Sequence, residues 1–387
     1  MRAIGVVTTS RADYSYYVPL LRAIESESGL RLQLIVSGMH LCPEFGMTVK
    51  AIEADGFPIA SRVHVLLGSD APQAIAKSMG MGVIGFGQAF AELQPDILVV
   101  FGDRFEMHAA ALAALPFRIP TAHISGGDVT EGAIDDALRH SLTKLCHLHF
   151  VATDEQAQRV RQMGEEDWRV TVTGALSLDA MRTTPRMTAQ EFRDRFGVNT
   201  EVPFLLVTYH PVTLEFEDAQ RQIDALLSAL DAVGMAVLFT APNADTGGQV
   251  VAAALRQYVA AHSNSWLVDS LGQVGYFSAM ELATAMVGNS SSGIIEAVSF
   301  GLPVVNIGTR QRGRMRGKNI LDCDSARESI EAATRTALSA EFRSAMRDME
   351  NPWGGGDAAA RIVERLKTVE IGDSLVRKRF IDRRQRD

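Results

Sequence analysis

Carboxylates and one arginine gather in a short stretch of the sequence, residues 123–144. Four acids fall within nine residues there: Asp128, Glu131, Asp135 and Asp136. Arg139 follows Asp135 by four positions, so on a helix these two side chains share a face. Positioned carboxylates act as general acids and bases, and the stretch indicates proton transfer. A solvated helix with one ion pair is the alternative when the stretch is taken alone.

Two glycines, Gly126 and Gly127, precede these acids. Glycine lets a backbone turn tightly or approach a ligand closely, and we expect one of these two uses here. From about Ala133 the pattern becomes helical. The predicted apolar stripe consists of Ile134, Ala137, Leu138 and Leu142.

Charged residues also follow two apolar segments that read as buried strands. Asp103 and Arg104 come directly after residues 97–101, with a helix N-cap as the alternative role for Asp103. Arg11 and Ser15 follow residues 3–8, where Arg11 beside a helix start suits an anion unless it is a plain surface arginine. Because a Gly-x-Gly-x-x-Gly fingerprint is missing, a classical dinucleotide site is not expected.

The second half of the chain has polar loops in equivalent places. His210 ends the predicted strand 204–209 and is expected to point toward the site. Residues 288–296 include Ser290, Ser291 and Glu296, and residues 308–314 add Arg310 and two further arginines. Hydroxyls, free backbone N–H groups at a helix start and cations together predict a nucleotide diphosphate site. A serine-rich turn beside a basic loop is the alternative.

Strands alternate with helices along the chain, which predicts doubly wound, mostly parallel α/β sheets. Predicted strands occupy residues 3–8, 32–36, 97–101, 148–152, 204–209, 236–240, 283–288 and 303–307. Predicted helices occupy residues 16–26, 45–55, 74–93, 109–115, 154–163, 223–233, 250–261 and 358–367. Asp357 is the predicted cap of the last helix.

The alternation weakens in a polar segment between residues 174 and 203, which sets the predicted domain boundary. We expect an N-terminal Rossmann-like domain over 1–175 with the carboxylates, and a C-terminal one over 176–368 that binds the diphosphate. Ligands of open α/β sheets bind beyond the carboxyl ends of the strands, so the two domains should face each other across a cleft. The basic tail, residues 369–387, is expected to be solvated or to pack back on the first domain.

Composition excludes several classes of function. A net charge of −8 does not suit a protein that coats nucleic acid, and no apolar run has the length of a membrane span. The N-terminus lacks the shape of a signal peptide. Three separate cysteines favour neither a metal site nor a disulfide framework, so a reducing cytoplasm is expected. His147 and His149 are interpreted as structural, without a third metal ligand nearby.

Taken in order, the motifs of the chain resemble the hydrolysing UDP-N-acetylglucosamine 2-epimerases, the NeuC-type enzymes of sialic acid and legionaminic acid biosynthesis. The resemblance covers nearly the whole length. It rests on residues 10–14, 102–104, 123–144, 210–212, 243–245, 288–296, 308–314 and 351–354. The Gly-Thr-Arg-Pro-Glu first loop of the non-hydrolysing relatives is absent.

This resemblance implies a glycosyltransferase-B fold and a reaction without cofactor or metal. The C2 proton is abstracted, UDP is eliminated across C1–C2, and water adds to 2-acetamidoglucal to give N-acetylmannosamine. Near the sugar it places Asp103, Glu131, Asp135, Arg139 and His210. For binding the rest of the substrate it suggests Arg11, Ser15, Arg104, Asp128, Asn243, Ser290, Ser291, Glu296 and Arg310. It also implies a homodimer or homotetramer.

Ser125 departs from the family pattern, because many members have an acid or a histidine at this position. Asp128 and Glu131 are the candidates for the missing proton transfer, so the choice of base and acid stays open. The sugar also stays open between N-acetylglucosamine and a UDP- or GDP-linked 2,4-diacetamido-2,4,6-trideoxyhexose. Two other classes of function, a glycosyltransferase of the same fold and a non-catalytic nucleotide-sugar sensor, remain as alternatives.

Overall fold

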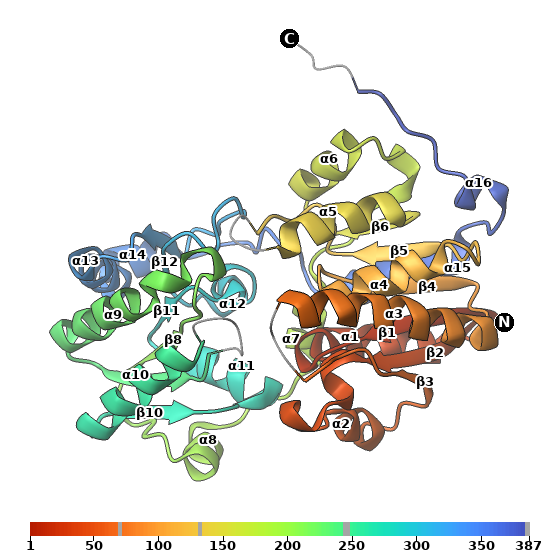
Figure 1. Cartoon of the computed structure of the whole chain (residues 1–387). Coiled ribbons are helices and arrows are strands. Elements are labelled where there is room, and N and C mark those ends of the chain that lie inside the picture. The colour runs from red at the N-terminus through yellow and green to blue at the C-terminus, as the bar shows by residue number, and fades with distance from the viewer. Residues whose placement is uncertain (69–71, 131–133, 243–247, 384–387) are drawn as a thin grey trace. The chain divides into compact units, whose positions relative to one another are not determined.

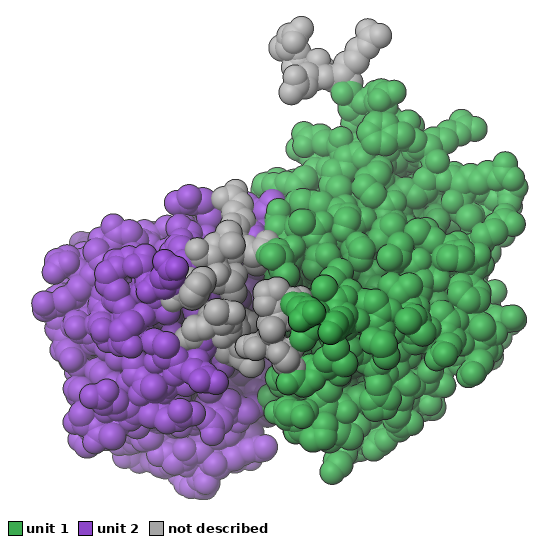
Figure 2. Space-filling model, viewed as in Figure 1, with its two compact units in different colours: residues 1–128, 134–182, 353–387 green, residues 129–133, 183–352 purple. Residues whose placement is uncertain are grey.

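The structure, a computed structural model, describes residues 1–68, 72–130, 134–242 and 248–383. The chain forms two compact units, shown in separate colours in Figure 2. Unit 1 comprises Met1–Asp128, Ile134–Arg182 and Trp353–Asp387, and unit 2 comprises Val129–Ala133 and Thr183–Pro352. Within the described ranges, none of the helices combines the length and the hydropathy that a membrane span needs.

Unit 1 is built on a parallel sheet, with the described strands in the order β3-β2-β1-β4-β5-β6-β7 (Figure 1). The strands are β1 (Arg2–Thr8), β2 (Leu30–Ser37), β3 (Ile59–Val63), β4 (Ile97–Phe101), β5 (Thr121–Ile124), β6 (Leu148–Val151) and β7 (Val170–Val172). Its central strands are near-continuous apolar runs because helices cover both faces of the sheet.

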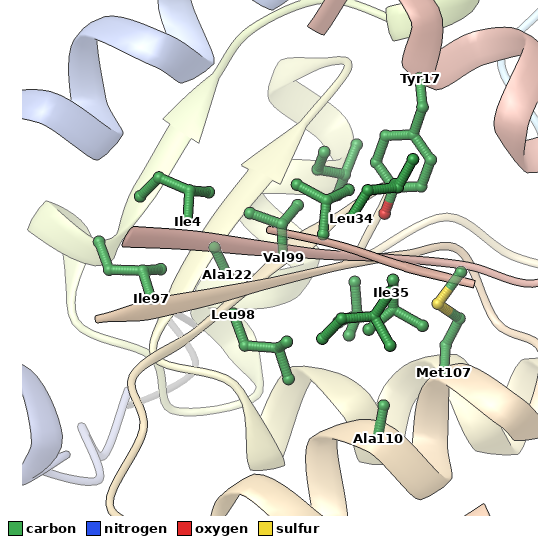
Figure 3. Packing of buried hydrophobic residues seen from close by; sticks show 14 of the residues in the cluster. Ile4, Tyr17, Leu34, Ile35, Ile97, Leu98, Val99, Met107, Ala110 and Ala122 are labelled. Carbon is green, nitrogen blue, oxygen red and sulfur yellow. The ribbon is translucent and has the colours of Figure 1, made fainter. Parts of the chain in front are cut away.

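The helices of unit 1 lie on both faces of this sheet. They are α1 (Arg11–Ser26), α2 (Val49–Ala54), α3 (Pro72–Leu93), α4 (Phe105–Ala114), α5 (Asp135–Leu145), α6 (Asp154–Gln162), α7 (Leu176–Thr183), α15 (Ala358–Thr368) and α16 (Asp373–Val376), with 3₁₀ turns η1 (Gly38–Leu41), η2 (Pro43–Phe45) and η3 (Asp167–Arg169). Tyr17 of α1 packs on one face, and Met107 and Ala110 of α4 pack on the other (Figure 3).

Unit 2 repeats the architecture with a parallel sheet in the order β10-β9-β8-β11-β12-β13. Its strands are β8 (Phe204–Thr208), β9 (Ala236–Thr240), β10 (Ser265–Val268), β11 (Ala285–Gly288), β12 (Val304–Ile307) and β13 (Ile320–Cys323). Its helices are α8 (Ala189–Phe196), α9 (Ala219–Val233), α10 (Gly248–Ala261), α11 (Gly272–Leu282), α12 (Ser291–Ile294), α13 (Arg327–Leu338) and α14 (Ala340–Ala345), with 3₁₀ turns η4 (Thr213–Asp218) and η5 (Ala297–Phe300). The predicted class, two parallel doubly wound α/β units, is confirmed.

Helix α1 begins five residues earlier than predicted, at Arg11. Ser10 takes the N-cap position, and the carboxylate of Asp13 accepts a hydrogen bond from the backbone N–H of Ser10 at 3.1 Å. This capping box turns residues that read as a polar loop into the first helical turn. Arg11 therefore lies on a helix rather than in a loop.

Five of the described strands were not predicted from the sequence. Four of them, β3, β7, β10 and β13, are the outermost strands of the two sheets. Edge strands are half exposed and lack a continuous apolar run, as the mixed burial of β3 and β13 illustrates. The fifth strand, β5, is central but has only four residues and follows Pro120.

The last helix, α15, belongs to unit 1, whereas the predicted boundary placed it in the second domain. Ile362 and Leu366 of α15 are buried in the core of unit 1, and the helix packs against α1. Its cap also differs from the prediction. Asp357 stands at the N-cap position, but the buried Asp179 of α7 accepts the N–H groups of Ala358 at 3.0 Å and Ala359 at 2.9 Å.

Candidate active site

In unit 1, Arg139 of α5 and Asp103 at the end of β4 form an ion pair. The Nη2 group of Arg139 donates to Oδ2 of Asp103, and Nη1 lies 3.9 Å from Oδ1 of Asp136. Arg139 is only 3% exposed, so the buried face of α5 includes a guanidinium group. The predicted apolar stripe is correct for Leu142, but it is wrong for Ile134, which is 65% exposed, and for Ala137, which is also exposed.

Asp135, at the first position of α5, lies close to this pair. Partial burial raises the pKa of Asp135 from 3.8 to about 6, and the negative charge of Asp103 adds to the effect. Arg104 and Arg139 act in the opposite direction without cancelling it. A carboxyl group with a pKa near neutrality can both give and take a proton, as acid–base catalysis requires.

Arg104 forms an ion pair with a buried acid, Glu106, which the sequence analysis did not single out. Its Nη2 group donates to Oε1 of Glu106 at 2.8 Å, and Glu106 is completely buried. Burial by itself would lower the pKa of Arg104, but Glu106, Asp13 and Asp135 raise it. Gly38, with φ +57°, makes room for this acid, since a Cβ atom there would come within 2.9 Å of Oε1 of Glu106.

A second buried acid, Asp13, lies at the start of α1. Its carboxylate accepts hydrogen bonds from the hydroxyls of Thr8 and Thr9 and from the N–H groups of Thr9 and Ser10. Burial raises its pKa despite these donors. His40 lies 4.0 Å from the carboxylate, and burial lowers the pKa of His40 to about 4, so this imidazole is neutral near pH 7.

The loop after β5 contains the two glycines and Ser125. Ser125 has φ +66°, a left-handed conformation that costs a non-glycine residue about 1 kcal/mol or more. Gly127, with φ +74°, approaches α6 so closely that a Cβ atom would lie 2.5 Å from the carbonyl oxygen of Gln156. The close approach expected of this glycine is therefore made to the protein's own backbone. Asp128, next in the chain, is buried and acts electrostatically on Arg139.

Arg11 and Ser15 lie together on the first turns of α1. Arg11 is exposed, and its charge contributes to the lowered pKa of His40, after burial and Arg104. The Ser15 hydroxyl donates to the carbonyl oxygen of Arg11 at 2.7 Å. Both residues follow the carboxyl end of β1, at the same edge of the parallel sheet as Asp103 after β4.

In unit 2, His210 is fixed by Asn289, which the sequence interpretation did not single out. The N–H of His210 donates to Oδ1 of Asn289 at 2.8 Å, and Nδ2 of Asn289 donates back to the His210 carbonyl at 2.7 Å. Asn289 is 1% exposed and sits at the end of β11. Burial, followed by the charge of Arg310, lowers the pKa of His210 to about 3, so its imidazole is neutral near pH 7.

The loop after β12 is hydrogen-bonded to Asn289 as well. Arg310 and Gln311 both donate to the backbone carbonyl of Asn289, at 3.0 and 2.8 Å. Thr309 donates to Oε1 of Glu215, at 2.6 Å. Asn289 therefore connects the ends of β8, β11 and β12, which are the segments with His210, the serines and Arg310.

The serine loop follows Asn289 directly. Ser290 is the N-cap of α12, and its hydroxyl accepts the N–H of Ser292 at 3.3 Å. The expected helix is a single turn, Ser291–Ile294, followed by the short turn η5. Glu296 lies between the two turns, is 1% exposed and acts electrostatically on Tyr276.

The predicted site residues thus fall into two groups, one on each unit. The group on unit 1 consists of Arg11, Ser15, Asp103, Arg104, Asp128, Asp135 and Arg139, and the group on unit 2 consists of His210, Ser290, Ser291, Glu296 and Arg310. Glu131 and Asn243 lie outside the described residues.

Three buried polar residues were missed, and only one had a usable signal. Asp13 follows Ser10 by three positions, which is the spacing of a capping box. Glu106 and Asn289 had none, because a buried glutamate on an alanine-rich helix and an asparagine in a polar loop read as ordinary surface residues. The role of Asn289 depends on a contact with His210, 79 positions away, and the role of Glu106 depends on its burial beside Arg104.

Polar and charged groups at the carboxyl ends of two doubly wound sheets are typical of α/β proteins that bind their ligands at strand ends. A family model described as UDP-N-acetylglucosamine 2-epimerase matches residues 22–367. The chain belongs to this family.

Three relatives cover almost the full length of the chain. A protein of Campylobacter jejuni named GDP/UDP-N,N'-diacetylbacillosamine 2-epimerase (hydrolyzing) is 38% identical, with 98% of this chain and 99% of that protein covered. UDP-N,N'-diacetylbacillosamine 2-epimerase (hydrolyzing) of Legionella pneumophila is 34% identical, with 98% and 99% covered. UDP-N-acetylglucosamine 2-epimerase of Neisseria meningitidis is 32% identical, with 99% of each chain covered.

Solved structures agree on the fold. The crystal structure of UDP-GlcNAc 2-epimerase from Neisseria meningitidis bound to UDP-GlcNAc has a TM-score of 0.81 at 17% identity, with 95% of this chain and 99% of that chain covered. At this level of identity the likeness concerns the fold alone, which is the glycosyltransferase-B type expected from the sequence.

Proposed function

We propose that the chain is a hydrolysing nucleotide-sugar 2-epimerase. The substrate is a nucleotide-linked 2-acetamido sugar, and the products are the free 2-epimeric sugar and the nucleoside diphosphate. Family membership together with three hydrolysing or UDP-N-acetylglucosamine 2-epimerases above 30% identity supports the reaction class. The single structural observation behind the proposal is the group formed by Asp103, Asp135 and Arg139.

The proposed chemistry needs two proton-transfer groups with different properties. The C2 proton of an acetamido sugar is very weakly acidic, so its removal requires a positioned carboxylate. Asp103 is paired with Arg139, while Asp135, with a pKa of about 6, is partly protonated near neutral pH. We assign Asp103 as the base and Asp135 as the acid. Asp128 and Glu131 remain the other candidates for the second role.

The leaving nucleoside diphosphate gains charge as the C1–O bond breaks. Groups that donate hydrogen bonds to this charge lower the barrier of elimination. We assign this part of the reaction to unit 2, with Ser290, Ser291 and Arg310 as diphosphate donors and Glu296 as acceptor for ribose hydroxyls. Arg11, Ser15, Arg104 and Asn243 are proposed as further substrate-binding residues.

The identity of the sugar is proposed from the relatives. The two with 38% and 34% identity are named for N,N'-diacetylbacillosamine, and the one with 32% is named for UDP-N-acetylglucosamine. UDP-N-acetylglucosamine was the first expectation from the sequence, and the UDP- or GDP-linked 2,4-diacetamido sugar was the second. The higher identities favour the second substrate, which differs at C4 and C6.

A turnover experiment in heavy water tests the reaction. The chain is incubated with UDP-N-acetylglucosamine and with UDP- and GDP-linked N,N'-diacetylbacillosamine, and free nucleotide and free sugar are measured. The expected product is a free 2-epimeric sugar with deuterium at C2. A released sugar that retains protium at C2 would exclude the mechanism. Transfer of the sugar to an acceptor would instead identify a glycosyltransferase, and binding without turnover would identify a sensor.

A further inference from the structure

The C-terminal tail binds the end of the helix that contains Asp135 and Arg139. Lys378 is only 16% exposed at its side chain, although it lies in a basic tail. Its ammonium group donates to the carbonyl oxygens of Thr143 at 3.1 Å, Lys144 at 3.0 Å and Cys146 at 2.5 Å. Thr143 and Lys144 belong to the last turn of α5, and Cys146 is its C-cap.

These contacts provide hydrogen-bond partners for backbone carbonyl groups at the C-terminal end of the helix. The last four carbonyl groups of an α-helix have no partner within the helix, and a cation near them also interacts favourably with the helix dipole. Lys378 supplies both effects to α5 from a distance of more than two hundred residues along the chain. Of the two expectations for the tail, Lys378 fits packing against the first unit and not a solvated end.

The ammonium group is itself held in place by a buried acid. Lys378 lies 2.8 Å from Oε2 of Glu165, which is completely buried. The same carboxylate contacts Lys144 of α5 at 2.5 Å and His149 of β6 at 3.0 Å. Glu165 therefore links the C-terminal end of α5, strand β6 and the tail.

The tail is anchored independently of Lys378. Arg169, which is 1% exposed, donates to the carbonyl oxygens of Leu375 at 2.8 Å, Ser374 at 2.9 Å and Arg377 at 3.2 Å. The N–H of Ile381 donates to the carbonyl of Gly164 at 2.9 Å. Lys378 is thus presented to α5 from a fixed backbone, and the loss of its ammonium group need not release the tail.

We infer that Lys378 is a positioning residue that fixes the C-terminal end of α5 and, through this helix, the placement of Asp135 and Arg139. The inference rests on the proposed function of these two residues. Reacting groups must be held within fractions of an ångström, and a misplacement of about 1 Å costs about 10²-fold in rate. The tail thereby becomes part of the catalytic apparatus without touching the substrate.

The test compares the full-length variants Lys378→Met, Lys378→Arg and Arg377→Met. Arg377 is the matched control, because its side chain is 76% exposed and forms a surface ion pair with Asp373. We expect kcat of Lys378→Met to fall about 10- to 100-fold. Affinity for UDP, measured by calorimetry, should stay within about twofold, since the proposed diphosphate residues lie on unit 2. Lys378→Arg should regain most of the rate because a guanidinium also donates several hydrogen bonds.

Hydrogen exchange gives a readout that does not depend on turnover. Amides in the last turn of α5 should exchange faster in Lys378→Met than in Arg377→Met. Equal exchange and equal kcat in these two variants would overturn the inference. A parallel loss of kcat, UDP binding and folded protein in Lys378→Met, without recovery in Lys378→Arg, would also overturn it. If the wild-type chain turned over no nucleotide sugar, the proposed function would fail instead, and exchange would still decide whether Lys378 fixes α5.

Discussion

Asp135→Asn should make the protein more stable above pH 6 while it removes activity. The raised pKa of Asp135 means that the folded chain binds this proton more tightly than the unfolded chain does. The associated stabilisation is complete below the ordinary value of 3.8 and is lost as the pH rises to about 6. Above that pH the ionised side chain destabilises the fold by a constant amount. Asparagine has the same shape without the charge and avoids this penalty.

The size of the effect follows from the change in pKa. A rise from 3.8 to about 6 corresponds to about 3 kcal/mol, at about 1.4 kcal/mol for each factor of ten in the dissociation constant. Asp135 is only partly buried, and screening by solvent reduces the expected gain to about 1–2 kcal/mol. Turnover should fall by about 10²–10⁴-fold, as for loss of an acid–base group.

Urea unfolding of the wild type and of Asp135→Asn between about pH 4 and pH 8 measures the difference. The two curves should coincide near pH 4 and separate as the pH rises. Asp136→Asn is the control, because Asp136 lies 3.9 Å from Arg139 and 3.5 Å from His140 and should gain no stability on neutralisation. An Asp135→Asn variant that is no more stable than the wild type at pH 8, or that keeps full turnover, would refute the reasoning.

Three further substitutions test other contacts. Arg139→Met removes the cation that pairs with Asp103 and should lower the free energy of unfolding by about 3–5 kcal/mol. Arg139→Lys should lose less stability but should still reduce turnover. Asn289→Ala leaves the N–H and C=O of His210 without their side-chain partner, at about 1–3 kcal/mol for each group, and calorimetry should record weaker UDP binding. Asp179→Ala should cost about 1–2 kcal/mol in thermal unfolding, and Asp357→Ala less than about 0.5, so equal effects would contradict the assignment of the cap.

Much of the fold was predictable because buried strands in parallel sheets are recognisable apolar runs. β1 and β4 of unit 1 and β8 and β9 of unit 2 were found in this way. The edge strands were not found, since their half-exposed faces contain polar residues. The start of α1 was misplaced because a capping box resembles a polar loop until its side chains are seen to bond the backbone.

The candidate site was only partly visible for a related reason. Asp103, Asp135 and Arg139 stood out by their positions after a strand and on a helix, and the pair between Asp103 and Arg139 joins residues 36 positions apart. Asn289 gave no signal because the backbone groups that it binds belong to His210, 79 positions away. Glu106 gave none because its complete burial beside Arg104 cannot be read from the sequence. The type of a polar residue does not reveal whether it lies in a surface loop or in a buried hydrogen-bond network.

The sequence by itself determined the alternation of strands and helices, the two-unit class and the types of charged group at the strand ends, because periodicity and loop composition are local properties. Only the tertiary structure decided which of these groups pair, how burial raises the pKa of Asp135, and that Asp179 caps α15 while Lys378 binds α5. Each of these depends on desolvation or on a partner brought close by folding, and neither distance through space nor exclusion of water can be read from neighbouring residues.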